Sequence, residues 1–170
     1  GSMDGQKLQR VKDALLILID QADVEDEIAL LRFSDKSQLL VPMAPVSDSQ
    51  RAALKRAVQG LSANGNTALL DATLEGYNLL LAQPKDKIGG LIVLTDGEEN
   101  RSNIRLNALT DAIQKGNVQN PLVVFCIAYG GEAGTRTLSS ITAAAGALGQ
   151  VRDSDPASIQ RLYEDLQKYF

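Results

Sequence analysis

Apolar and polar positions along the chain follow two spacings, one typical of helices and one typical of buried strands. Three- and four-residue spacing predicts helices over 5–22, 47–60, 68–82, 104–115 and 135–145, and from Asp155 to the C-terminus. Short continuous apolar runs predict strands over 27–34, 91–94 and 122–128, with further short strands over 37–41 and 150–152. We expect Pro42 and Pro45 to end pairing of the 37–41 strand at a sheet edge. We expect Gly116 to end the fourth helix.

Strands therefore alternate with helices, and the core strands are apolar on both faces. This pattern predicts an α/β fold with a doubly wound, mostly parallel central sheet flanked by helices. The 170 residues suit a single domain spanning 1–170. In such sheets ligands bind beyond the carboxyl ends of the strands, so polar residues at those ends are the candidates for a site.

Composition excludes several classes of function. The formal net charge is −4 and the pI is about 4.8, which gives no electrostatic support for nucleic-acid binding. The chain has no histidine, phosphate loop or nucleophile with an accompanying base, so we do not expect an enzyme. No apolar run approaches the roughly 18 residues of a membrane span. The single cysteine, Cys126, lies in an apolar run, which predicts a buried and inert thiol.

Three positions carry candidate chemistry. Asp96 follows an apolar strand, where its carboxylate can turn over the strand end, and its alternative role is to cap the turn. Thr67 follows a turn-forming Asn-Gly-Asn run and precedes a helix, and its alternative role is a plain N-cap. Ser2 precedes the first helix, and it is open to two other interpretations, a helix cap or a remnant of cloning before a native Met3.

Four segments resemble, in the right order, motifs of the von Willebrand factor A-type (VWA) domain. Residues 90–100 (GLIVLTDGEEN) resemble the fourth strand ending in T-D-G-E, and residues 61–72 resemble the G-T-x-L-x-D-A loop and helix. Residues 26–34 are similar to the second strand, and residues 127–130 and 159–166 to the fifth strand and last helix. The resemblance covers essentially the whole chain and implies a Rossmann-like fold. It is strongest to the VWA region of bacterial proteins that also carry a solute-binding-like domain. Such a parent protein would be membrane-associated or extracytoplasmic, although the sequence itself assigns no compartment.

The family's metal-ion-dependent adhesion site (MIDAS) combines D-x-S-x-S, a loop threonine and an aspartate after the fourth strand. The resemblance therefore implies Ser2, Thr67 and Asp96 as ligands of Mg²⁺ or Mn²⁺. The leading aspartate and first serine of the motif do not occur in this sequence, and neither does the hydrophobic first strand. We therefore expect weak or no metal binding by this N-terminally truncated chain alone.

The function that the resemblance implies is protein binding or cell adhesion, in which a partner's Glu or Asp coordinates the metal. Asn66, Gly97 and Glu98 would line the partner-binding surface. In the family the first strand lies between the second and the fourth, so its loss would leave two edges whose unpaired backbone groups each cost about 1–3 kcal/mol. The alternative is a metal-independent interaction or assembly domain, such as a strand-swapped or edge-paired homodimer.

Overall fold

The structure, a computed structural model, describes residues 5–62, 65–86, 88–95, 99–129 and 132–153, together with Arg161, Glu164 and Asp165. The helices are α1 (Gln6–Gln21), α2 (Asp48–Gln59), α3 (Leu69–Leu81), α4 (Leu106–Gln119), α5 (Glu132–Ala144) and the short 3₁₀ helix η1 (Gly146–Leu148). The strands are β1 (Glu27–Phe33), β2 (Ser37–Pro45), β3 (Gly89–Thr95), β4 (Leu122–Ala128) and β5 (Gly149–Asp153). The helix expected from Asp155 onwards lies largely outside the described residues.

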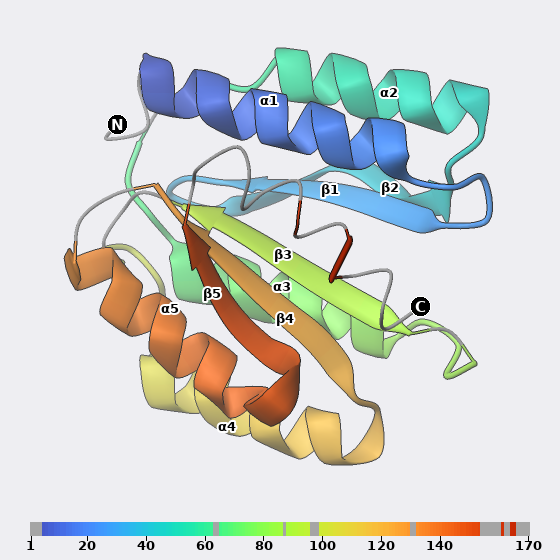
Figure 1. Ribbon diagram of the computed structural model, residues 1–170. Coiled ribbons are helices and arrows are strands. Elements are labelled where there is room, and N and C mark those ends of the chain that lie inside the picture. Colours follow the sequence, from blue (N-terminus) through green and yellow to red (C-terminus); the bar gives the residue numbers. More distant parts are fainter. Residues whose placement is uncertain are drawn as a thin grey trace.

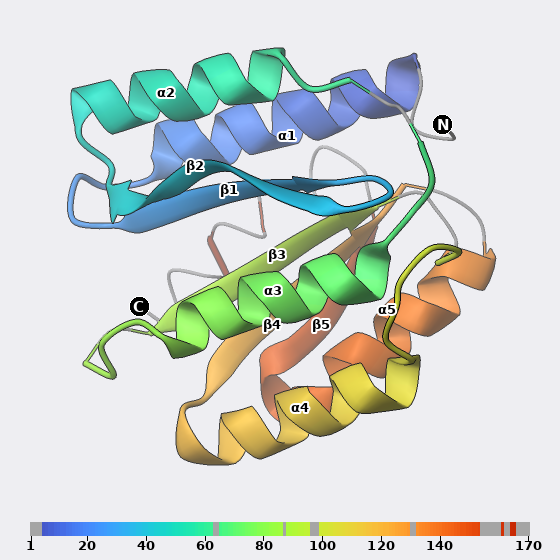
Figure 2. The same ribbon diagram turned by 180° about the vertical axis from the view of Figure 1, so that it is seen from behind.

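The described strands form two sheets. β1 and β2 pair antiparallel, while β3, β4 and β5 pair parallel in that order. Helices lie on both faces of the strands (Figures 1 and 2). The predicted α/β fold with a mostly parallel sheet flanked by helices is confirmed, and the two strands expected at 27–34 and 122–128 are found within one residue of their predicted ends.

The side-chain alternation of β4 shows how the layers are built. Val124 and Cys126 face the core made with α3, α4 and α5. Val123, Phe125 and Ile127 face the opposite core, which α1 covers. All five are buried, so the continuous apolar run is explained by two covered faces.

The sheet is broken between β1 and β3. Among the described residues, β3 pairs only with β4 and β1 pairs only with β2. β4, with a neighbour on each side, is buried from Leu122 to Ile127, whereas most residues of β3 are only partly buried. Among the described residues, the break lies where the VWA resemblance implies the first strand.

A third apolar core joins α1 and α2 to the β1–β2 sheet through Ile19, Val41, Leu54 and Val58. The side chain of Leu15 on α1 packs against this core and also against the core beneath β3 and β4. α1 therefore spans the break, and its side-chain packing holds the two sheets together (Figure 1).

Two residue types expected to end an element do not end it, and each case has a physical reason. β2 continues through Pro42 to Pro45, because it lies at a sheet edge and its register with β1 shifts near Pro42, where a missing amide donor is tolerated. α4 continues past Gly116 to Gln119. A Cβ at Gly116 would lie 2.5 Å from the hydroxyl oxygen of Tyr77, so this glycine serves close packing and does not end the helix.

Candidate functional site

The start of α3 lies at the carboxyl end of the sheet, between the segments that follow β1 and β3. The Ala68 amide donates to the Ser34 carbonyl at 2.8 Å, just beyond the end of β1. The Thr67 amide donates to Asn100 Oδ1 at 2.9 Å, and the Thr67 carbonyl accepts from the Asn100 amide at 3.1 Å. The backbone of Thr67 is therefore fixed from both sides of the break in the sheet.

Thr67 does not cap α3. The helix begins at Leu69, its N-cap residue is Ala68, and that residue makes no side-chain cap hydrogen bond. Instead, the Leu70 and Asp71 amides donate to Ser102 Oγ at 3.0 and 3.1 Å. The interpretation of Thr67 as an N-cap is therefore wrong, and its hydroxyl is left for another role.

Glu99 is the centre of the loop that follows β3. One carboxylate oxygen accepts from the Arg101 and Ser102 amides at 2.8 and 2.6 Å, and the other accepts from the Leu70 amide and Ser102 Oγ at 2.9 and 2.7 Å. Burial opposes ionisation of Glu99, but these hydrogen bonds outweigh it and lower the pKa of the carboxyl. Glu99 is therefore partly buried and hydrogen-bonded through both carboxylate oxygens.

Asp71, in the first turn of α3, in turn accepts hydrogen bonds from the loop that follows β3. Its carboxylate accepts from the Asn103 amide at 2.9 Å, from Asn103 Nδ2 at 2.8 Å and from the Ile104 amide at 3.1 Å. Burial opposes ionisation here too, and the hydrogen bonds more than offset it, so the pKa of Asp71 is lowered. We call the hydrogen bonds between residues 67–71 and 99–104 the interlock.

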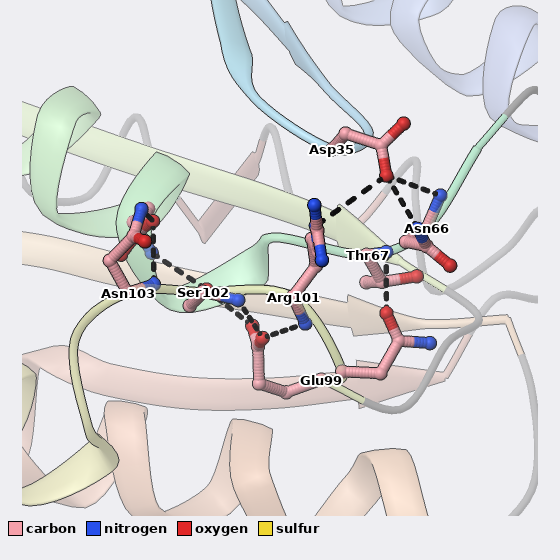
Figure 3. Close-up of polar contacts among 9 residues, drawn as sticks. Asp35, Asn66, Thr67, Glu99, Arg101, Ser102 and Asn103 are labelled. Atoms are coloured by element: carbon pink, nitrogen blue, oxygen red, sulfur yellow. Dashed lines mark hydrogen bonds and ion pairs between the residues drawn. The ribbon is translucent and has the colours of Figure 1, made fainter.

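Asp35, in the turn between β1 and β2, joins the same end of the molecule. Its Oδ1 accepts from Asn66 Nδ2 at 2.6 Å and lies 3.9 Å from Arg101 Nε (Figure 3). Gly65 has a φ of +83°, and a Cβ there would lie 2.9 Å from Asp35 Oδ2, so both the backbone angle and the space favour glycine. Three segments distant in sequence therefore meet at Asp35.

Of the sequence-predicted site residues, the structure describes Asn66 and Thr67, which are consecutive in the chain. Thr67 and Asn66 lie side by side at the carboxyl end of the sheet (Figure 3). Ser2, Asp96, Gly97 and Glu98 lie outside the described residues. Figures 1 and 2 show that α1 also begins at this end.

Thr67 suits the role of a neutral oxygen ligand, because its backbone is held and its hydroxyl caps no helix. The nearby carboxylates are engaged elsewhere, since Glu99 and Asp71 accept hydrogen bonds on both oxygens. Within the described part of the chain, no group of three or more acidic or cysteine side chains could hold an ion. Of the three predicted ligands, Asp96 would supply the charge, and it lies outside the described residues.

The pattern of the sequence missed the roles of Asp35, Glu99 and Ser102. Their contacts join residues about 30 positions apart, which local spacing does not reveal. Asp71 had a detectable signal, because an acidic residue in the first turn of a helix is favoured by the helix dipole.

The chain belongs to the von Willebrand factor type A domain family, whose family model matches residues 1–165. Domains of this family are generally protein-interaction or adhesion modules. Among the described residues, no helix is long and apolar enough to cross a membrane.

Relatives and solved structures agree with this assignment. The chain is 29% identical over 161 residues to an uncharacterized protein of Synechocystis sp., covering 92% of this chain and 36% of that protein. It is 30% identical to inter-alpha-trypsin inhibitor heavy chain H4 of Bos taurus, over 98% of this chain and 19% of that one. A von Willebrand factor type A structure from Catenulispora acidiphila superposes with a TM-score of 0.81 at 25% identity, over 98% of this chain and 39% of that one. The chain thus spans well under half the length of each.

Proposed function

We propose that the chain binds an acidic side chain of a protein partner at the carboxyl end of its sheet, through a divalent ion held by Ser2, Thr67 and Asp96. The observation that carries this proposal is the way in which Thr67 is held. Its backbone is fixed between the end of β1 and the loop after β3, and its hydroxyl is not used to cap α3. A hydroxyl on a fixed backbone that caps no helix, beside a strand end, is suited to act as a metal ligand.

The chemistry follows from the charge of the ligands. Mg²⁺ and Mn²⁺ prefer about six oxygens. Two hydroxyls and one carboxylate would leave the ion with a net positive charge, which attracts a partner's Glu or Asp. Asn66, Gly97 and Glu98 would line the surface that the partner covers. With only three protein ligands the affinity for the ion is weak, and the partner's carboxylate strengthens it.

Thermal melts with Mg²⁺ or Mn²⁺ and with a chelator test this proposal. We expect a metal-dependent rise in melting temperature that is absent in Thr67→Ala and in Asp96→Ala. Thr67→Ser keeps the hydroxyl, and it should keep the rise. A cooperative melt that does not respond to either ion would contradict the metal-dependent proposal.

A second candidate is a metal-independent assembly domain that pairs through its strand edges. The observation that favours it is the break in the sheet, where β1 and β3 each have a second edge without a partner strand in the described structure. Such edges are templates for pairing with another chain, and a strand-swapped or edge-paired homodimer would satisfy them. Sedimentation equilibrium over a range of concentrations tests this. A dimer is expected, and a monomeric mass with a stable melt would exclude it.

VWA domains are generally non-enzymatic interaction modules, and we propose the same for this chain. Turnover of a phosphoester or peptide substrate that disappears in Asp96→Ala would contradict this.

A further inference from the structure

We infer that Arg101 binds an acidic side chain of the partner, additional to the one on the proposed ion, and that it does so without a metal ion. The inference rests on one part of the proposed function, namely that an acidic partner binds at the carboxyl end of the sheet. It does not rest on the ion itself. Arg101 lies in the loop after β3 and faces Asp35 (Figure 3).

The base of Arg101 is held in place. Its amide donates to Glu99 Oε1 at 2.8 Å, and the amide of the next residue, Ser102, donates to the same oxygen at 2.6 Å. Through Glu99 and Ser102 this short segment is bound to the first turn of α3. The Arg101 side chain nevertheless remains 61% exposed. An exposed cation on a fixed backbone is positioned to meet an incoming group at little cost in ordering.

Asp35 lies near the Nε of the Arg101 guanidinium and not at its two terminal nitrogens. The Arg101 Nε lies 3.9 Å from Asp35 Oδ1, which is beyond hydrogen-bonding distance, and that oxygen already accepts from Asn66 at 2.6 Å. Within the described part of the chain, the two terminal nitrogens of Arg101 donate no hydrogen bond. These two nitrogens form the planar fork that matches a carboxylate.

The neighbours of Arg101 indicate the class of ligand. Asp35 is the side chain that lies within ion-pair distance of the guanidinium in the described structure (Figure 3). Its carboxylate lies near Nε, so the two terminal nitrogens remain to meet a carboxylate of the partner, which fits them better than an apolar or basic side chain. A partner segment with two neighbouring acidic residues can place one on Arg101 and the other on the proposed ion, so an acidic peptide is the ligand that fits best.

The experiment uses nuclear magnetic resonance to follow the arginine Nε–Hε signals of the full chain. The probes are acetylated, amidated peptides of sequence GEEG and GQQG, titrated first with a chelator and then with Mg²⁺. With the chelator we expect GEEG to shift the Arg101 signal in a saturable manner, and GQQG not to shift it. Because exposed ion pairs are weak, Arg101→Gln is expected to weaken GEEG binding, read from amide shifts, about threefold to fivefold.

Arg105→Gln is the matched control, since it removes the same charge from an exposed residue near the end of the same loop. It should bind GEEG within about twofold of the unchanged protein. Thermal melts of both variants check that they are folded. Equal affinity of Arg101→Gln and the unchanged protein in the chelator would overturn the inference.

The two proposals fail in different ways. If Mg²⁺ adds nothing to GEEG binding and Thr67→Ala behaves like the unchanged protein, the metal-dependent function fails while the Arg101 contact stands. If Mg²⁺ strengthens binding and Arg101→Gln has no effect with the chelator, the metal-dependent function stands and the Arg101 contact is wrong.

Discussion

The Leu70 amide donates a hydrogen bond to Glu99 Oε2 at 2.9 Å, across 29 positions of the sequence. The first turn of α3 is thus capped by the loop that follows β3 and not by the residue that precedes the helix. The loop that carries Thr67 and the loop that follows β3 are therefore held as one structural unit.

The first prediction concerns Glu99→Gln. In glutamine an NH₂ group replaces one carboxylate oxygen, so a donor would point at the N–H and O–H donors that now contact that oxygen. The negative charge that strengthens all four hydrogen bonds would also be lost. We expect a loss of about 1.5–3 kcal/mol in the free energy of unfolding, measured by urea denaturation. Glu25→Gln, at an exposed position, serves as the control and should change stability by less than about 0.5 kcal/mol. Equal stabilities of the two variants would show that the interlock contributes little.

The second prediction concerns pH. The pKa of Glu99 and that of Asp71 are both lower in the folded chain than their ordinary values of 4.5 and 3.8. A lowered pKa contributes stability above the ordinary value, and this stability is lost as the pH falls through the folded pKa. Stability should therefore decline below about pH 4.5, and the decline should be shallower in Glu99→Gln and Asp71→Asn. An unchanged slope in both variants would contradict the assignment.

The third prediction concerns the close approach of α3 and α4. A methyl group at position 116 would meet the Tyr77 hydroxyl, which is buried and donates to the Ile113 carbonyl at 3.0 Å. We expect Gly116→Ala to cost about 1–3 kcal/mol, measured by thermal and urea unfolding. Gly60→Ala is the control, because a Cβ there would make only ordinary contacts of 3.5 Å or more. A neutral Gly116→Ala would show that α4 shifts freely.

The fourth prediction concerns Cys126. The thiol is fully buried, and burial raises its pKa to about 12, so the nucleophilic thiolate is scarce at neutral pH. A disulfide reagent that detects free thiols should react with the native chain only slowly and with the urea-unfolded chain at once. Rapid reaction of the native chain would contradict the inert role.

The fifth prediction concerns the break in the sheet. Amides of β4, which has a paired strand on each side, should be the slowest in the sheet to exchange with deuterium. β3 has a strand on one side only, so the amides on its other edge should exchange much faster. Uniform protection along both strands would indicate that a partner strand, such as one from a second copy, covers that edge.

Local pattern predicted the elements whose causes are local. The apolar run at Leu122–Ala128 identified β4 because both faces are covered. The predicted helix over 47–60 matches α2, whose N-cap Ser47 accepts at Oγ from the Gln50 amide at 3.3 Å. Gly116 was wrongly expected to end α4, because this position is glycine for close packing against Tyr77 on another helix.

The candidate site likewise has parts that the sequence predicts and parts that it does not. The family motif pointed to Thr67 and to the neighbouring Asn66, whereas the contacts of Asp35, Glu99 and Ser102 depend on how distant loops meet. The metal-binding role of Ser2, Thr67 and Asp96 stays a prediction. So does the role of Asn66, Gly97 and Glu98 in partner binding.

The broken sheet has a mechanical consequence. Packed side chains such as Leu15, without a ladder of hydrogen bonds, hold the β1–β2 sheet beside β3, and such contacts resist sliding less well. The Ser34–Ala68 hydrogen bond ties the end of β1 to the residue after Thr67. A force that slides one sheet along the other therefore reaches Thr67 directly. If the domain is held under tension, the pulling force and the bound partner would act on the same few residues around Thr67.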